Sequence, residues 1–296
     1  MVTGSNGLLG QKLIHQLANR TDVELLATAR GTNRLRMQEG YAFASLDVTN
    51  AQEVMNLCKQ WQPEVIIHTA AMTQVDDCED QQEACWQLNV QAVDHLVRAC
   101  AAINAHLVHL STDFIFDGAA GPYDETATAN PLSFYGKSKL AAEKLLLESE
   151  ISYSIIRTVL VYGVAEDMSR SNIVLWAKGA LEKGQPLRIV SDQFRTPTLA
   201  EDLAAGCILA AIKRAQGIYN ISGKDQMSVI ELVKRVAKYF DLPTNQITEV
   251  TTDTLNQRAR RPLVTGFILD KARRDLGYEP HSFEEGIALV MSQTAQ

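Results

Sequence analysis

The chain has 296 residues, of which 46% are hydrophobic and 21% charged, a composition typical of a soluble globular protein. No apolar run approaches the ~20 residues that cross a bilayer, and no basic segment followed by an apolar core marks a secretion signal at its start. The formal net charge of −7 argues against general affinity for nucleic acid, so we expect a cytoplasmic protein without nucleic-acid or membrane partners.

The first half of the chain alternates short β-branched runs with longer amphipathic runs. This alternation predicts a parallel sheet with helices on both faces, and right-handed crossovers make it a doubly wound, Rossmann-like α/β sheet. We predict strands at 23–29, 41–46, 65–69, 106–111 and 153–161, and helices at 8–18, 51–61, 83–104 and 134–149.

The alternation of strand-like and helical runs changes after about residue 162, where helical stretches dominate and short strand-like runs separate them. We predict helices at 171–183, 199–215, 228–240, 269–276 and 283–292, with strands at 187–190 and 218–221. This part predicts a smaller, mixed α/β C-terminal lobe that caps the carboxyl edge of the sheet. The predicted division gives residues 1–164 and about 191–221 to the domain of the large sheet, and about 165–190 and 222–296 to the smaller lobe.

A glycine-rich loop opens the chain, in MVTGSNGLLG. Glycine permits a tight turn and close approach of the backbone, and the N-terminus of the following helix attracts a pyrophosphate. By itself the pattern also fits a turn before a buried helix, but the flanking strand and helix favour a dinucleotide site. The loop residues expected on the cofactor are Gly4, Asn6, Gly7, Leu8 and Gly10.

The second predicted strand ends in ATARGTNRL. Ala29 and Arg30 stand where an acid would bind the ribose 2′-hydroxyl of NAD, and Arg34 follows. A guanidinium suits a 2′-phosphate, so we expect NADP(H) rather than NAD(H), the alternative being that both arginines are solvated loop residues. Asp47, followed by Val48 after the third strand, is expected to accept from the adenine amino group.

A tyrosine and a lysine share one helix face in PLSFYGKSKLAAEKLL. The Lys139 ammonium is expected to lower the pKa of Tyr135 from about 10, which makes the phenol a proton donor or acceptor near neutral pH. This spacing is common by chance, and a solvated helix face is the alternative. The strand before it ends in Ser111 and Thr112, at the edge where open α/β sheets bind ligands.

These groups resemble the active site of the extended short-chain dehydrogenase/reductases, and further segments resemble its dTDP-4-dehydrorhamnose reductase group. The resemblance covers nearly the whole of this chain. The segments that carry it are HTAAMTQVDDCE, NVQAV, STDFIFDG, NPLSFYGKSKLAAE, DQFRTPTLAEDLA and RARRP. The resemblance implies an enzyme that uses NADPH to reduce the 4-keto group of dTDP-4-dehydro-6-deoxy-L-mannose. The product would be dTDP-L-rhamnose, for cell-surface polysaccharide.

The resemblance also implies roles for individual residues. Tyr135 would donate a proton to the developing alkoxide, Lys139 would hold the nicotinamide ribose, and Thr112, rather than Ser111, would hydrogen-bond the C4 oxygen. Asn89 would steady the sheet. Cofactor contacts are implied for Ala70, Ala71 and Thr73, and substrate contacts for Thr73, Val75, Asp76, Thr112, Asp113 and Phe114.

Arginines of the second half are expected on the diphosphate of the nucleotide sugar, because a guanidinium binds phosphate through two parallel donors. Surface arginines or salt bridges are the alternative. Arg195 departs from the family, in which a small residue is common at that position. The arginines concerned are Arg195, Arg258, Arg260 and Arg261.

Other functions stay open. A 4,6-dehydratase needs two acids after the active-site threonine, and here Asp113 is followed by Phe114, which disfavours it. Another nucleotide-sugar 4-ketoreductase or an epimerase, and a non-catalytic NADP-binding regulator like that of methionine adenosyltransferase, remain alternatives.

The sequence also supports expectations about metal binding, oligomeric state and the start of the chain. His68 and Cys78 have no partners at ligand spacing, so we expect no metal, and the five unpatterned cysteines favour reduced thiols. We expect a homodimer. Since Gly4 follows only three residues, fewer than the ~5 of an ordinary strand, we also expect a few residues before Met1 in the natural protein.

Overall fold

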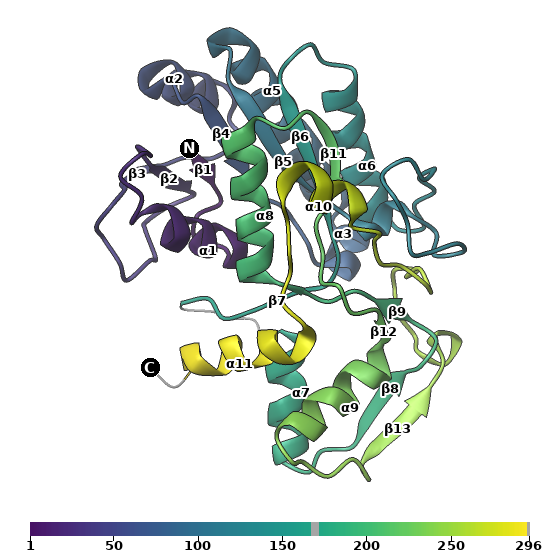
Figure 1. The fold of residues 1–296 in the computed structure, drawn as a ribbon. Coiled ribbons are helices and arrows are strands. Elements are labelled where there is room, and N and C mark those ends of the chain that lie inside the picture. The colour runs from purple at the N-terminus through teal and green to yellow at the C-terminus, as the bar shows by residue number, and fades with distance from the viewer. Residues whose placement is uncertain (167–171, 295–296) are drawn as a thin grey trace.

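A computed structural model describes residues 1–166 and 172–294 of the chain. Its larger part is a seven-stranded parallel sheet with the strand order β11-β6-β5-β4-β1-β2-β3 (Figure 1). The predicted doubly wound α/β class is confirmed. The strands are β1 (Val2–Thr3), β2 (Leu26–Ala29), β3 (Ala42–Ser45), β4 (Val65–His68), β5 (His106–Thr112), β6 (Tyr153–Thr158) and β11 (Gly217–Asn220).

Helices cover both faces of this sheet because the buried strand residues alternate between two cores. Ile67 faces one core, together with α1 (Leu8–Leu17), α8 (Ala200–Lys213) and α10 (Asp270–Leu276). Its neighbour Ile66 faces the other, as the two-residue period of a strand requires. The second core contains residues of α2 (Ala51–Trp61), α5 (Ala92–Ile103) and α6 (Phe134–Leu147).

A smaller lobe with its own core lies below the sheet in Figure 1. Two short sheets form it, one parallel and one antiparallel, and two further strands, β7 (Val161–Tyr162) and β10 (Thr198–Leu199), pair beside it. Its strands are β8 (Leu187–Val190), β9 (Phe194–Arg195), β12 (Met227–Ser228) and β13 (Ile247–Val250), and its helices are α7 (Ile173–Glu182), α9 (Val229–Tyr239) and α11 (Phe283–Thr294).

Several predicted elements differ in detail. The predicted helix 83–104 is α4 (Gln82–Trp86), a π-helical turn η1 (Gln87–Gln91) and α5. The predicted strand 153–161 ends at Thr158, because Leu160 has a φ of 36° in the left-handed region. Residue 171 of the predicted helix 171–183 lies outside the described residues.

Of the described elements with four or more residues, α3 (Val75–Asp80) and β13 were not predicted. The helix is short and acidic, and the strand is half exposed, so neither has a clear apolar period. The division into lobes stays a prediction. The predicted division assigns α10 to the smaller lobe, whereas its Ala272 and Leu276 belong to the core of the large sheet. None of the described helices is both long and apolar enough to cross a membrane.

Candidate active site

The glycine loop joins β1 to α1 and packs against the end of β4. Gly4 has a φ of 73°, and a Cβ there would lie 2.7 Å from the Ala70 nitrogen. A Cβ on Gly10 would lie 2.2 Å from the Gly4 oxygen. Both positions therefore require glycine. Gly7 provides no side-chain cap for α1, and the first turn of this helix has no acid, so its N–H groups and positive dipole end suit a pyrophosphate.

Asn6 links this loop to the loop after β2. Its Nδ2 donates to the Thr32 oxygen, and its Oδ1 accepts from the Arg34 nitrogen, both at 2.9 Å. Arg30 and Arg34 are exposed. Near the end of β3, Asp47 Oδ1 accepts from the backbone and the hydroxyl of Thr49. Its neighbour Val48 is buried.

The start of α6 puts the tyrosine at the end of β5. Ser133 caps the helix by accepting from the Gly136 nitrogen, and Glu79 of α3 accepts from the Phe134 nitrogen at 2.7 Å. A Cβ on Gly136 would lie 2.2 Å from the Phe114 oxygen, so the helix touches the turn that follows β5. Tyr135 is buried there, with its ring edge-on to Phe114 at 5.8 Å.

The threonine and the tyrosine are in contact. Thr112 ends β5, and its Oγ1 accepts from the Phe114 nitrogen at 3.2 Å. Burial raises the pKa of Tyr135 above its usual value, and the hydrogen bond with Thr112 only partly offsets this. The expected lowering of this pKa is therefore wrong for the chain on its own, because burial dominates. Tyr135 is protonated at neutral pH.

Lys139 lies one helical turn after Tyr135 and is buried. Burial lowers its pKa to about 8, against the opposing effect of Glu143. Its Nζ is 3.4 Å from His109 Nε2. Burial and the charge of Lys139 hold the pKa of His109 well below its usual value, so this imidazole is a neutral acceptor.

His109 in turn stacks on His68, with ring centroids 5.7 Å apart. His68 Nδ1 lies 2.7 Å from the Thr3 hydroxyl, and burial lowers the pKa of His68 to about 3. His109 was not predicted from the sequence; its one signal is its position in β5, three residues before Thr112. Among the described residues, no group of three or more His, Cys, Asp or Glu side chains could hold a metal ion.

Asn89, in the π-helical turn η1, holds the loop after β4. Its Oδ1 accepts from the Met72 nitrogen at 2.8 Å, and its Nδ2 donates to the Met72 oxygen at 3.0 Å and to Ser138 Oγ at 3.1 Å. It thereby ties this loop to α6. Ala70 and Ala71 of the same loop are half-buried, and Thr73 is exposed.

Arg258 and Arg261 lie against the acidic helix α3. Arg261 Nη2 is 2.8 Å from Asp76 Oδ2, and the Ala259 nitrogen donates to Asp76 Oδ1 at 3.0 Å. Arg258 pairs with Asp80. These ion pairs hold residues 258–265, the C-terminal segment, against α3, close to half-buried Val75. The neighbouring Arg260 is exposed.

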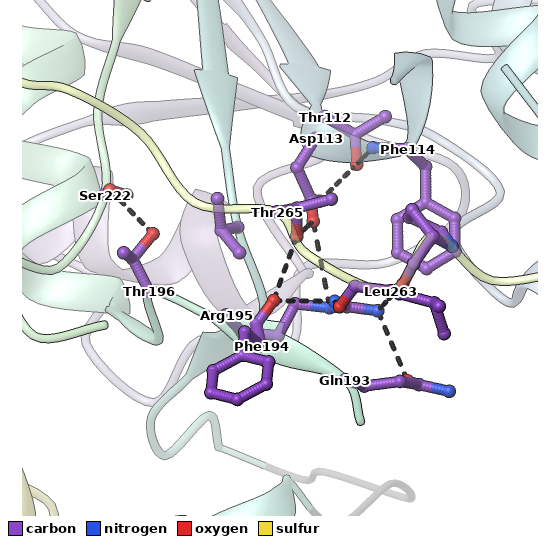
Figure 2. Close-up of polar contacts among 12 residues, drawn as sticks. Thr112, Asp113, Phe114, Gln193, Phe194, Arg195, Thr196, Ser222, Leu263 and Thr265 are labelled. Atoms are coloured by element: carbon purple, nitrogen blue, oxygen red, sulfur yellow. Dashed lines mark hydrogen bonds and ion pairs between the residues drawn. The ribbon is translucent and has the colours of Figure 1, made fainter. Parts of the chain in front are cut away.

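Arg195 is buried instead of facing a solvent-filled site. Figure 2 shows its guanidinium among Gln193, Phe194 and Leu263, below the Thr112–Asp113 turn. Its Nη atoms donate to three backbone carbonyls and one amide oxygen of the chain. These donors are therefore already used.

A sequence profile of the RmlD substrate-binding domain matches residues 1–296, the whole chain. The chain belongs to this family. The predicted resemblance to the dTDP-4-dehydrorhamnose reductases among the extended short-chain dehydrogenase/reductases is thereby confirmed, as is the predicted class of NAD(P)H-dependent oxidoreductase.

Three relatives illustrate the family. Methionine adenosyltransferase 2 subunit beta of Rattus norvegicus is 32% identical over 267 residues, which cover 88% of this chain and 78% of that protein. The dTDP-4-dehydrorhamnose reductase of Aggregatibacter actinomycetemcomitans is 29% identical over 301 residues, covering 97% and 96%. A dTDP-4-dehydrorhamnose reductase structure from Bacillus anthracis, in complex with NADP, has a TM-score of 0.84 at 27% identity, covering 99% of this chain and 98% of that one.

Proposed function

We propose that this RmlD-family chain uses NADPH to reduce the 4-keto group of a dTDP-4-dehydro-6-deoxyhexose, converting dTDP-4-dehydrorhamnose to dTDP-L-rhamnose for cell-surface polysaccharide. The observation that supports this best is the set of three buried side chains, with Tyr135 and Lys139 one helical turn apart on α6 and Thr112 at the end of β5. The three side chains lie at the carboxyl end of β5, where open α/β sheets bind ligands.

The chemistry follows from the protonation states. When bound, the reduced nicotinamide supplies the hydride. Tyr135 keeps its proton at neutral pH, since burial raises its pKa, and donates it to the C4 oxygen as negative charge develops there. Thr112 gives its one hydroxyl hydrogen to Asp113 in the free chain, so its expected hydrogen bond to the same C4 oxygen requires this hydrogen to turn to the substrate. Lys139, with a pKa of about 8, is charged at neutral pH and stabilises the phenolate that remains.

We propose NADP(H) rather than NAD(H) as the cofactor. The uncapped first turn of α1 supports a pyrophosphate beside the glycine loop, and exposed Arg30 and Arg34 supply charge for a 2′-phosphate. Exchange of both arginines for alanine should weaken NADPH binding and leave NADH binding within about twofold. The proposed cofactor contacts are Gly4, Asn6, Gly7, Leu8, Gly10, Arg30, Arg34, Asp47, Val48, Ala70, Ala71, Thr73, Tyr135 and Lys139.

The proposed substrate side lies between α3 and the C-terminal segment. The ion pair of Asp76 with Arg261 supports a shared wall there. A dehydratase is disfavoured, because both oxygens of Asp113 already accept hydroxyl hydrogens and Phe114 stands where the second acid would be. The proposed substrate contacts are Thr73, Val75, Asp76, Thr112, Phe114, Arg258 and Arg261. Asp113 and Arg195, which were also expected there, are left out because their polar atoms already bond within the chain.

The test is the loss of reduced-nicotinamide absorbance when NADPH and a dTDP-4-keto-6-deoxyhexose are added to the protein. Tyr135→Phe should lower kcat by about 10²–10⁴-fold, the usual effect of removing a general acid. Tyr153→Phe, at the opposite end of the sheet in β6, is the matched control and should keep full activity. Turnover that survives Tyr135→Phe would overturn the mechanism.

A second function is a non-catalytic regulator. The 32% identity to methionine adenosyltransferase 2 subunit beta favours it. Tight NADP(H) binding without turnover of any 4-keto sugar would support the regulator over the reductase. We further propose a cytoplasmic homodimer, which sedimentation of the purified protein tests, and the division into lobes at 1–164 with about 191–221, and about 165–190 with 222–296.

A further inference from the structure

A buried carboxylate follows the active-site threonine and accepts a hydroxyl hydrogen on each of its oxygens. Thr112 Oγ1 donates to Asp113 Oδ1 at 3.1 Å, and Thr265 Oγ1 donates to Asp113 Oδ2 at 2.5 Å (Figure 2). Asp113 is 2% exposed. Because Thr265 belongs to the C-terminal segment, this carboxylate joins the reacting end of β5 to residues far along the chain.

The positive charge nearest to this carboxylate is fixed in place. Arg195 donates to the backbone oxygens of Phe194, Leu263 and Pro262 at 2.7, 3.0 and 2.8 Å, and to Gln193 Oε1 at 3.2 Å. These acceptors use both Nη atoms, so the guanidinium cannot turn toward a ligand without losing them. Its Nε lies 3.9 Å from Asp113 Oδ2, which is an ion pair without a direct hydrogen bond.

The arrangement of hydrogen bonds around Asp113 suits an ionised carboxylate. An ionised carboxylate accepts on both oxygens, whereas a protonated acid carries a donor on one of them. Burial favours the neutral acid and raises the pKa of Asp113, while the charge of Arg195 and the two hydroxyl donors oppose this rise. The other groups that act on this pair are Tyr135 of α6 and Arg261 of the C-terminal segment.

We propose that Arg195 is a positioning residue, which keeps Asp113 ionised so that Asp113 holds the Thr112 side chain beside Tyr135 until the substrate oxygen takes over the Thr112 hydrogen. This role replaces the predicted contact of Arg195 with the substrate diphosphate, and it also assigns Asp113 and Thr265 to the support of Thr112. The inference rests on the proposed reductase activity.

The first experiment compares steady-state kinetics of the wild type and Arg195→Met over a range of pH. We expect kcat to fall by about tenfold or more at neutral pH, within the ~10²-fold that a misplaced catalytic group costs, and to recover as the pH rises and Asp113 ionises. The affinity for dTDP should change by less than about twofold. A diphosphate ligand gives the opposite pattern, in which dTDP binding weakens at every pH while the shape of the kcat profile is unchanged; that result would overturn the proposal.

Two milder variants keep the test usable if Arg195→Met does not fold. Arg195→Lys retains a positive charge and should restore the wild-type pH profile. Thr265→Val removes one donor to Asp113 and should shift the profile in the direction of Arg195→Met, but less. Arg235→Met is the matched control, because Arg235 pairs with Glu284 in the smaller lobe. It should leave the pH profile of kcat unchanged. A shifted profile in this variant would contradict the assignment of the pH effect to Arg195.

The second experiment does not depend on turnover. It measures the free energy of unfolding against pH for the wild type, Arg195→Met and the double variant Arg195→Met/Asp113→Asn. A raised pKa in the folded chain stabilises it below the unfolded pKa and loses that stabilisation as the pH rises through the folded pKa. Without Arg195 the pKa of Asp113 rises further, so this stabilisation is lost up to a higher pH. The free energy of unfolding of Arg195→Met should therefore fall further below that of the wild type from acid to neutral pH. In the double variant the difference from the wild type should not grow in this way.

The two experiments fail for different reasons. A wild type that reduces no 4-keto sugar overturns the proposed function and, with it, the positioning role. A deficit of Arg195→Met that stays constant with pH overturns the charge coupling between Arg195 and Asp113, whatever the enzyme's activity.

Discussion

The molecule contains two buried arginine–carboxylate pairs, Arg157 with Glu143 and Arg195 with Asp113, which differ in their hydrogen bonds. Arg157 of β6 meets Glu143 of α6 through two parallel hydrogen bonds, Nε to Oε1 at 3.0 Å and Nη2 to Oε2 at 2.7 Å. Arg195 keeps its Nε 3.9 Å from Asp113 and gives its other donors to the backbone. The first pair uses up both carboxylate oxygens, and the second leaves them free for hydroxyl groups.

This difference separates a stabilising contact from a contact beside the reacting centre. Glu143 is completely buried, and Arg157 also donates to the Glu125 oxygen, so this pair fastens α6 to the sheet. Asp113 instead accepts from Thr112. An arginine held by carbonyl groups can supply charge to a carboxylate without blocking it, which suits a carboxylate that must orient another side chain.

The largest effect on stability is expected from Arg157→Met. It leaves the Glu143 carboxylate buried without its bidentate partner, which should lower the free energy of unfolding by about 3–5 kcal/mol. Urea unfolding at neutral pH measures this. The double variant with Glu143→Gln removes the unpaired charge and should regain much of the loss. A loss below 1 kcal/mol for the single variant would show that the pair adds little to the fold.

A smaller loss of stability is expected from Asp113→Asn. Arg195 keeps its four other acceptors in this variant, so we expect a loss of about 1–3 kcal/mol, in the range of an imperfectly satisfied buried hydrogen-bonding group. Its kcat should nevertheless fall further than that of Glu143→Gln. Urea unfolding and kcat, measured on the same preparations, check that Asp113→Asn loses less stability than Arg157→Met and more kcat than Glu143→Gln. A larger loss of kcat in Glu143→Gln would contradict the difference between the two pairs.

The pH dependence distinguishes the pairs through the lysine of α6. The charge of Glu143 raises the pKa of Lys139, which burial has lowered from 10.5 to about 8. Glu143→Gln should therefore move the alkaline fall of kcat/KM to lower pH, because the ammonium deprotonates earlier. Asp113→Asn should leave that fall where it is. The measurement is kcat/KM against pH for both variants, and an equal displacement would be the contrary result.

Lys139 also predicts a pH dependence of stability. Its folded pKa is below the unfolded value, so the unfolded chain binds more protons between about pH 8 and 10.5. The free energy of unfolding contributed by this group then rises with pH across that window. Lys139→Met should remove this rise in urea titrations, whereas Lys178→Met, on α7 of the smaller lobe, should keep it.

The smallest effect is expected from an exposed ion pair. Arg98 and Asp94 lie one turn apart on α5 with the arginine side chain 72% exposed. Arg98→Ala should change the free energy of unfolding by no more than about 0.5 kcal/mol, because solvent screens such pairs. This variant is the reference for Arg157→Met in the same urea titration, and a loss comparable to that of the buried pair would contradict the role assigned to burial.

The local pattern of the sequence predicted much of the large sheet. The strands near 65–69 and 106–111 and the helix of Tyr135 lie where their apolar periods indicate. Helix 83–104 was predicted without its π-helical turn η1, which contains Asn89 and its hydrogen bond with Met72. α3 was missed because its acids pair with a segment far along the chain.

The sequence by itself determined the nature of the fold, the glycine loop and the Thr112, Tyr135 and Lys139 set, because short spacings and hydrophobic periods encode these features locally. Only the tertiary structure decided the environment of those groups. The pKa of Tyr135 rises instead of falling because burial outweighs the effect of Thr112, and the charge of Asp113 adds to the rise. Arg195 is turned inward because backbone carbonyls from residues near 262 accept its hydrogens there. Desolvation and long-range contacts depend on which segments pack together, and no local spacing in a single sequence records that.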